Sequence, residues 1–249
     1  MAPNSYNTRL NPLLWIGLPI FVYIYPYASN LPSINLEEGV YREYGFVENR
    51  TAVFLALTLF FGIRLIIATS GFRRIYYLFF NLGVLYFLGE EISWGQFYFS
   101  WNTPETYASI NTQEETNLHN LPGIYNELFA KIPRLMLSIL SLVGGGIIPL
   151  FFLYKTRSFK PDSIHAWIWP SFISIVTVFF INAVALPYRI AHALDRELPQ
   201  IFDIESSELK ECFIALFLLL YMLTSRKHHL SEVAGSGPED TPGDRLPAP

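Results

Sequence analysis

Six long apolar stretches constrain the fold of this chain more than any other feature. A helix needs about 20 residues to cross the hydrocarbon core of a bilayer, and each stretch approaches that length. The stretches are continuous and do not alternate apolar with polar residues, so they predict helices and not the strands of a barrel. We therefore expect an all-α, polytopic membrane helix bundle with about six transmembrane helices. The predicted spans are 12–28, 51–69, 75–99, 135–154, 167–189 and 209–224.

Composition supports this class and excludes others. The chain of 249 residues is 51% hydrophobic and only 15% charged, which is too apolar for an ordinary soluble domain. A net charge of -4 offers no basic surface for nucleic acid. The single cysteine, Cys212, excludes an internal disulfide and a cysteine-based zinc cluster. Residues 1–230 should form one transmembrane domain, and the tail 231–249, rich in Gly, Pro and acids, should be disordered.

The distribution of charge predicts the orientation. Six spans place basic residues from several helix ends on one side, and the positive-inside bias makes that side cytoplasmic. Both termini are then cytoplasmic, and most of the carboxylates fall on the outer side. The basic residues on the cytoplasmic side are Arg9, Arg64, Arg73, Arg74, Lys155, Arg157, Lys160, Arg226 and Lys227.

The pair Glu90-Glu91 is the strongest candidate site, because it directly follows the apolar run 75–89. Carboxylates at membrane depth carry a large desolvation cost and usually mark a proton, ion, metal or substrate site. The predicted topology places further ionisable side chains on the same outer side, where one pocket could gather them. These side chains are His119, His192, Asp195, Glu205, Glu208 and Glu211.

Imidazole and carboxylate groups together suit zinc, iron or manganese, and a metal would stabilise carboxylates that otherwise repel each other. One hypothesis is therefore a metal-dependent hydrolase or transferase that acts on a lipid or lipid-linked substrate. Glu90 would be the general base toward a metal-bound water. The metal ligands would be His119 and His192 with one or more of Glu91, Asp195 and Glu208.

Apart from Glu90 and Glu91, these residues also have a plainer interpretation. Glu208 and Glu211 suit the first turns of the last helix, where the macrodipole favours negative side chains. His192 and Asp195 suit a surface ion-pair network, and His119 suits a loop histidine that bonds the local backbone.

Two functions without catalysis fit the same residues. In the first, the protein is a subunit of a larger membrane protein complex. In the second, it is a proton- or cation-coupled transporter with Glu90 and Glu91 at the ion site. The sequence supports the enzyme, the subunit and the transporter as alternatives.

One segment resembles a known group of proteins. The stretch Gly89-Glu90-Glu91-Ile92-Ser93-Trp94-Gly95-Gln96 is followed by Thr103-Pro104-Glu105 and then by Glu115-Thr116-Asn117-Leu118-His119-Asn120-Leu121. It is similar to a segment shared by uncharacterised multi-pass membrane proteins of bacteria. The resemblance implies a bacterial inner (plasma) membrane and a pairing of Glu90 and Glu91 with the segment Asn117–Asn120. It adds to the candidate site Ser93, Trp94, Gln96, Asn117 and Asn120.

Overall fold

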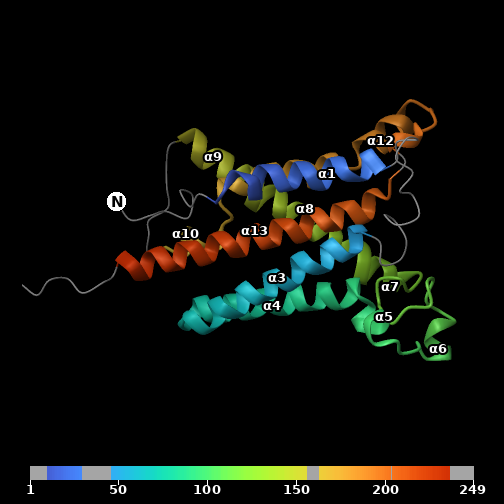
Figure 1. Cartoon of the computed structure of the whole chain (residues 1–249), viewed down its shortest axis with the longest axis horizontal. Helices are drawn as coiled ribbons and strands as arrows, with labels where there is room; N and C mark the ends of the chain where they lie inside the picture. Colours follow the sequence, from blue (N-terminus) through green and yellow to red (C-terminus); the bar gives the residue numbers. More distant parts are fainter. Residues whose placement is uncertain (1–9, 30–45, 156–162, 203, 236–249) are drawn as a thin grey trace, which may run out of the picture.

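The computed structural model describes residues 10–29, 46–155, 163–202 and 204–235. These residues form helices, turns and loops and contain no β-strand. The long helices lie side by side along one axis (Figure 1). Three helical segments are long and apolar enough to cross a membrane: Val47–Ala68, Ile124–Tyr154 and Phe172–Ala193. A shorter apolar helix covers Leu13–Ser29.

The long helical segments are built from consecutive elements. The first four are the π-helix η2 (Leu13–Gly17), α1 (Leu18–Ser29), α3 (Phe46–Ala68) and α4 (Gly71–Glu91). A polar region follows with η3 (Ser93–Gly95), α5 (Gln96–Phe99) and α6 (Glu105–Ala108). The next segment comprises α7 (Ile124–Asn126), η4 (Glu127–Lys131), α8 (Ile132–Leu140), η5 (Ser141–Ile147) and α9 (Ile148–Lys155). The remaining elements are α10 (His165–Ile168), η6 (Phe172–Ser174), α11 (Ile175–Ala183), α12 (Leu186–Ala193), η7 (Gln200–Phe202) and α13 (Ser206–Gly235).

Helix α13 forms the centre of the bundle. It packs against α3 and α11, and α3 in turn packs against α4. Every residue from Cys212 to Met222 is buried, including Phe213 and Leu216, which are fully enclosed. A helix that is apolar on all sides is expected in an interior position, because each face needs an apolar neighbour.

Two glycines allow close contact between helices. A Cβ atom at Gly62 of α3 would overlap the Asn81 side chain of α4, and one at Gly145 of η5 would overlap the Phe217 ring of α13. These positions let the backbones approach closely, as small residues do at helix interfaces in membranes.

The helical segments differ in their boundaries from the predicted spans, and the fourth, predicted over 135–154, begins at Ile124. The third was expected to run to Phe99, but α4 ends at Glu91 because the next residues bend the chain. Their φ angles are +45° at Ser93, +53° at Trp94 and +89° at Gly95, all in the left-handed region. This region is unfavourable for residues with a Cβ, so a continuous α-helix cannot pass through it.

The fifth span is interrupted as well. Helix α10 ends at Ile168, and η6 begins only at Phe172. Pro170 lies in this gap and lacks the amide that a continuous helix would need. The predicted span 167–189 is therefore two helical pieces.

Helix α13 is longer than the predicted span 209–224. It continues to Gly235, so the expectation of disorder is wrong for 231–235, and residues 236–249 lie outside the described part of the chain. The extension is held by Arg73 of α4, whose guanidinium donates to Glu232 at 2.6 Å. Arg73, which lies outside the extension, therefore holds residues 231–235 against α4 through its hydrogen bond to Glu232.

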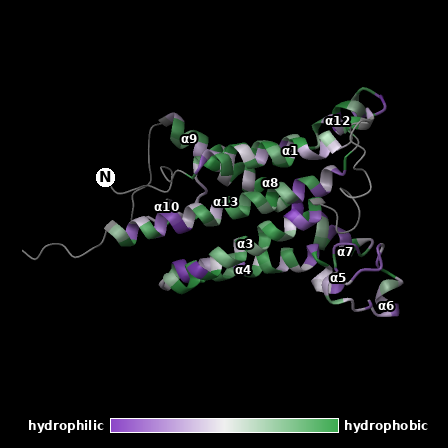
Figure 2. Cartoon of the chain, in the orientation of Figure 1, coloured by the Kyte–Doolittle hydropathy of each residue, from purple (hydrophilic) through white to green (hydrophobic). Residues whose placement is uncertain are grey.

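The ends of the bundle differ in character. Hydrophobic residues dominate the middle of the long helices, whereas the region around α5, α6 and α7 is largely hydrophilic (Figure 2). The start of α4 carries Arg73 and Arg74 at the opposite end from Glu90 and Glu91, which close the same helix. Within α4, basic and acidic residues therefore lie at opposite ends of the helix.

Candidate functional site

The end of α4 is a compact local unit. After the bend, the Trp94 side chain turns back and its indole Nε1 donates to Glu90 Oε1 at 3.0 Å. The ring passes over Gly89, where a Cβ atom would lie only 2.8 Å from ring carbons. The Trp94 side chain therefore has a specific partner, Glu90, at the end of α4.

Glu90 joins this unit to the polar loop. Its second oxygen, Oε2, accepts hydrogen bonds from the backbone amides of Leu118 at 2.8 Å and His119 at 3.0 Å. The ring Nδ1 of His119 lies 3.3 Å from the same oxygen. Glu90 is only 4% exposed, so its carboxylate is buried and its acceptor sites are occupied by protein. Glu90 thus contacts the segment Asn117–Asn120, as the resemblance implies, whereas no such hydrogen bond of Glu91 is found among the described residues.

A second group of hydrogen bonds surrounds Glu115. Ser93 Oγ donates to Glu115 Oε2 at 2.7 Å, and Asn117 Nδ2 donates to the same carboxylate and to Ser93 Oγ. Asn120 Nδ2 also reaches Glu115 Oε2, at 3.3 Å. The side chains of Ser93, Glu115 and Asn117 are buried. Buried polar groups need such partners, so these residues form a scaffold.

Gln96 completes the scaffold. Its Oε1 accepts from the Thr116 amide at 2.7 Å and from Thr103 Oγ1 at 3.1 Å. Thr103 thereby contacts Gln96 and does not cap α6, for which no side-chain cap is formed. Most polar residues of the shared segment hold the loop onto the end of α4.

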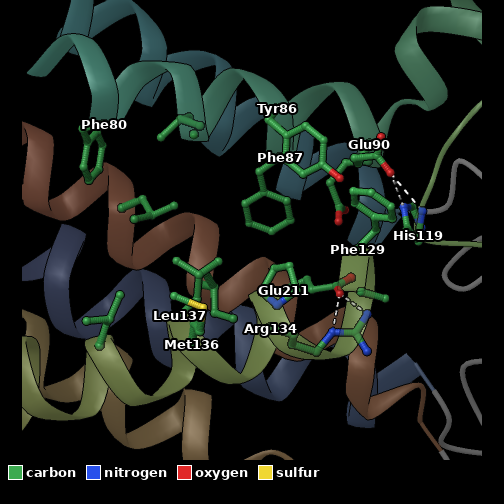
Figure 3. Close-up of a pocket in the computed structure, with 18 of the residues that line it drawn as sticks. Phe80, Tyr86, Phe87, Glu90, His119, Phe129, Arg134, Met136, Leu137 and Glu211 are labelled. Carbon is green, nitrogen blue, oxygen red and sulfur yellow. Dashed lines mark hydrogen bonds and ion pairs between the residues drawn. The ribbon is translucent and has the colours of Figure 1, made fainter. Parts of the chain in front are cut away.

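Beside this scaffold lies a cavity of about 450 Å³. Its long walls come from α4 and from the segment η4–α8, and its floor includes residues of α13. Apolar side chains such as Phe80, Phe87 and Leu137 line most of it, and ionisable groups gather at one end. Figure 3 shows Glu90, His119, Glu211 and Arg134 at that end and Phe80 at the other. The ionisable lining groups are Glu90, Glu91, His119, Arg134 and Glu211.

Most of these ionisable groups are paired. Arg134 Nε donates to Glu211 Oε1 at 2.6 Å, and Glu90 is paired with His119. Glu91 lines the cavity without a hydrogen bond or close ion pair among the described residues. It lies within electrostatic reach of Glu211, Glu208, Glu48 and Arg134. Two adjacent carboxylates of α4 therefore have different surroundings.

The remaining predicted ligands are distributed unevenly. Glu208 is near Glu211 at the start of α13 but does not line the cavity. His192 and Asp195 are exposed, at the end of α12 and just beyond it, and the His192 ring contacts Tyr188. Within the described ranges, no three His, Cys, Asp or Glu side chains are placed to hold a metal ion. The metal centre stays a prediction for which the described residues provide no ligand set.

Three residues that shape this region were not among the predicted site residues. Glu115 is the buried carboxylate of the scaffold, Arg134 is the cation paired with Glu211, and Tyr86 is an aromatic wall of the cavity. Tyr86 precedes Glu90 by four residues, so helical spacing could have placed both on one face. Nothing in the sequence marks Arg134 as the partner of Glu211, which is far away in the chain.

The fold and the site define a helical protein with three candidate membrane-spanning segments and one mainly apolar cavity with an ionisable end. Searches of protein-family models, of curated proteins and of solved structures found no match.

Proposed function

We propose that this protein is a multi-pass inner-membrane protein in which six helical segments cross the bilayer and both termini are cytoplasmic. Besides the three apolar segments, α1, α4 and α13 run through the same bundle (Figure 1). Helix α13 carries Arg226 and Lys227 toward the end where α4 carries Arg73 and Arg74. The positive-inside bias favours the cytoplasm for that end and the outer side for Glu91.

We further propose that the cavity binds a lipid or lipid-linked substrate, on which the protein acts as a hydrolase or transferase. The observation that carries this proposal is the arrangement of an apolar channel that ends at ionisable groups. From Phe79 to Glu90 the channel follows α4 for about 16 Å at 1.5 Å per residue. One leaflet of a hydrocarbon core measures about 15 Å. A chain within one leaflet would therefore fill the channel and bring its headgroup to the ionisable end.

His119 is best suited to move a proton in this reaction. Glu90 holds its Nδ1 and its backbone amide, while Nε2 has no protein partner among the described residues. A carboxylate that fixes one imidazole nitrogen leaves the other to accept or donate a proton. We assign the proton transfer to His119 and a positioning role to Glu90, in place of the general-base role that the sequence suggested for Glu90.

A metal-dependent form of this reaction remains part of the proposal. His119 and Glu91 are the cavity residues that could bind zinc, iron or manganese, and Glu90 would then orient the imidazole, as carboxylates commonly do for metal-bound histidines. Elemental analysis of purified protein tests it: about one equivalent of metal that is lost in His119→Ala supports a metal centre. Wild-type protein without metal would restrict the chemistry to His119 alone.

Substitutions at the cavity wall test lipid binding. Gly83 lines the cavity, and a Cβ atom added there would meet no other atom within 4 Å, so Gly83→Phe should fill the channel without a clash. Leu82→Phe is the matched control, because Leu82 is 51% exposed and does not line the cavity. Native mass spectrometry should find bound lipid in the wild type and in Leu82→Phe, and none in Gly83→Phe. Equal lipid occupancy in all three proteins would refute the proposal.

Turnover needs a separate measurement. Wild-type protein incubated with a bacterial lipid extract should deplete one lipid class, as followed by mass spectrometry. His119→Asn should retain bound lipid and lose this turnover, because the substitution removes the proton-transfer group while Glu90 can still accept the backbone amides.

A non-catalytic subunit is the second candidate. The observation in its favour is that Ser93, Gln96 and Asn117 of the shared segment are used in internal hydrogen bonds. Such a segment would order the loop for a protein partner. Stable co-purification with another membrane protein, together with loss of that complex in Ser93→Ala, would favour this function over catalysis.

A further inference from the structure

Two polar groups that line the cavity have no hydrogen-bond partner among the described residues. Glu91 lines the ionisable end without a hydrogen bond or close ion pair in the part of the chain that the structure describes. The hydroxyl of Tyr86, which lines the same cavity, is shielded from solvent and has no hydrogen-bond partner there either. The Tyr86 hydroxyl lacks the partner that buried polar groups normally find, and the half-buried Glu91 carboxylate lines the same cavity, so the two groups point to a ligand group that supplies the missing interactions.

The arginine that lines the cavity is already engaged. Arg134 donates to Glu211 at 2.6 Å through Nε, and a second contact from its terminal nitrogen reaches the same carboxylate. The other carboxylate of the cavity, Glu90, accepts hydrogen bonds from Trp94, Leu118 and His119. The lining therefore holds three carboxylates and one arginine, and the carboxylate left over is Glu91.

We infer that the cavity recognises an amphiphile with a cationic amine headgroup and one alkyl chain. This inference rests on the proposed lipid-binding function and names the class of lipid. The ammonium group would donate to the Glu91 carboxylate and to the Tyr86 oxygen, and the chain would lie along Phe80, Phe87 and Leu137. A half-buried carboxylate in an apolar cavity is stabilised most by an opposite charge that also donates hydrogen bonds.

The same groups disfavour an anionic headgroup. A phosphate at the ionisable end would face Glu90, Glu91 and Glu211, and the single arginine would have to leave Glu211 to bind it. Like charges in direct contact are repelled strongly where water is excluded. A phosphate-headed amphiphile with the same chain should therefore bind more weakly than the amine.

Three probes with the same chain separate the possibilities. Dodecylamine, dodecanol and dodecyl phosphate are titrated into the full-length protein in a neutral detergent, and bound probe is measured by native mass spectrometry. Dodecylamine should bind to the wild type, and its affinity should fall about tenfold or more in Glu91→Gln and by a smaller factor in Tyr86→Phe. Glu114→Gln, which changes an exposed carboxylate of the polar loop, should leave binding unchanged.

The Gly83→Phe variant distinguishes the proposal that the cavity binds lipid from the assignment of an amine headgroup. If dodecanol or dodecyl phosphate binds as tightly as dodecylamine and Gly83→Phe removes that binding, the amine assignment is wrong and the lipid cavity stands. If Gly83→Phe changes the binding of none of the probes, both are wrong. Should Glu91→Gln fail to fold, the comparison of the three probes on the wild type decides the assignment.

Discussion

The adjacent carboxylates Glu90 and Glu91 should respond differently to the same substitution. Glu90 accepts hydrogen bonds from the Trp94 indole, from two backbone amides and from the His119 ring. A glutamine at this position has one oxygen, which can replace Oε2 and keep both amides as partners. Its NH₂ group then faces the indole N–H of Trp94, so two donors meet and one hydrogen bond is lost.

The size of the effect follows from these contacts. One lost hydrogen bond from the Trp94 indole, which is partly exposed, costs about 0.5–1.5 kcal/mol, and the three charge-assisted bonds at Oε2 become neutral ones at about half the strength. We expect Glu90→Gln to lower the free energy of unfolding by about 3 kcal/mol. Glu91→Gln removes a charge that has no hydrogen-bond partner among the described residues, so its effect should stay within about 0.5 kcal/mol or be stabilising.

Unfolding with a denaturing detergent in mixed micelles, followed by circular dichroism, measures both variants against the wild type. Hydrogen exchange gives a local readout, since the amides of Leu118 and His119 should exchange faster in Glu90→Gln only. The reasoning is refuted if the two variants lose equal stability, or if Glu91→Gln is the less stable protein.

Three further predictions follow from the helix contacts. Gly145→Ala should lower the free energy of unfolding by about 1–3 kcal/mol, because the new methyl group would overlap the Phe217 ring; a thermal melt unchanged from wild type would contradict this. Gly83→Ala should be neutral or stabilising by up to about 1 kcal/mol, since its methyl group meets open space in a helix; a large loss of stability would show that the cavity is closed. Beyond the apolar part of α13, burial opposes ionisation of Glu232, but hydrogen bonds from Arg73 outweigh it and hold its pKa below the ordinary 4.5. The stability that the Arg73–Glu232 pair contributes is present above pH 4.5 and should be lost as pH falls through the lower folded pKa of Glu232. Glu232→Gln should lack this component of the pH dependence. Parallel melting profiles of the wild type and Glu232→Gln from pH 7 to pH 3 would refute this prediction.

The helical class and the approximate positions of the long segments could be read from the sequence. Continuous apolar runs predict helices because only helices satisfy every backbone group within one segment. The breaks were harder to predict. Trp94 was placed inside a continuous helix, and its left-handed conformation depends on an indole that contacts Glu90 and packs over Gly89. Pro170, by contrast, was a local signal for the interruption before Phe172.

The candidate site shows the same division between local and distant causes. The sequence located the acidic pair at the end of an apolar run, because the desolvation cost of a carboxylate is a property of its immediate surroundings. It predicted a general base at Glu90 and a metal ligand at Glu91, but it could not assign the structural roles that the fold gives to these two carboxylates. Those roles come from His119 and Arg134, which reach the end of α4 only after the chain has folded. His192, equally plausible in the sequence, lies exposed at the end of α12 instead.

By itself the sequence determined a helical, apolar chain with charges separated toward opposite ends, since hydrophobicity and backbone hydrogen bonding act along each segment independently. The tertiary structure decided that Glu90 is buried and hydrogen-bonded to the polar loop, whereas Glu91 faces the cavity. The physical reason is that hydrogen bonds and ion pairs require partners within a few ångströms. For Glu90 these partners include Leu118 and His119, which only the folded loop brings to the end of α4.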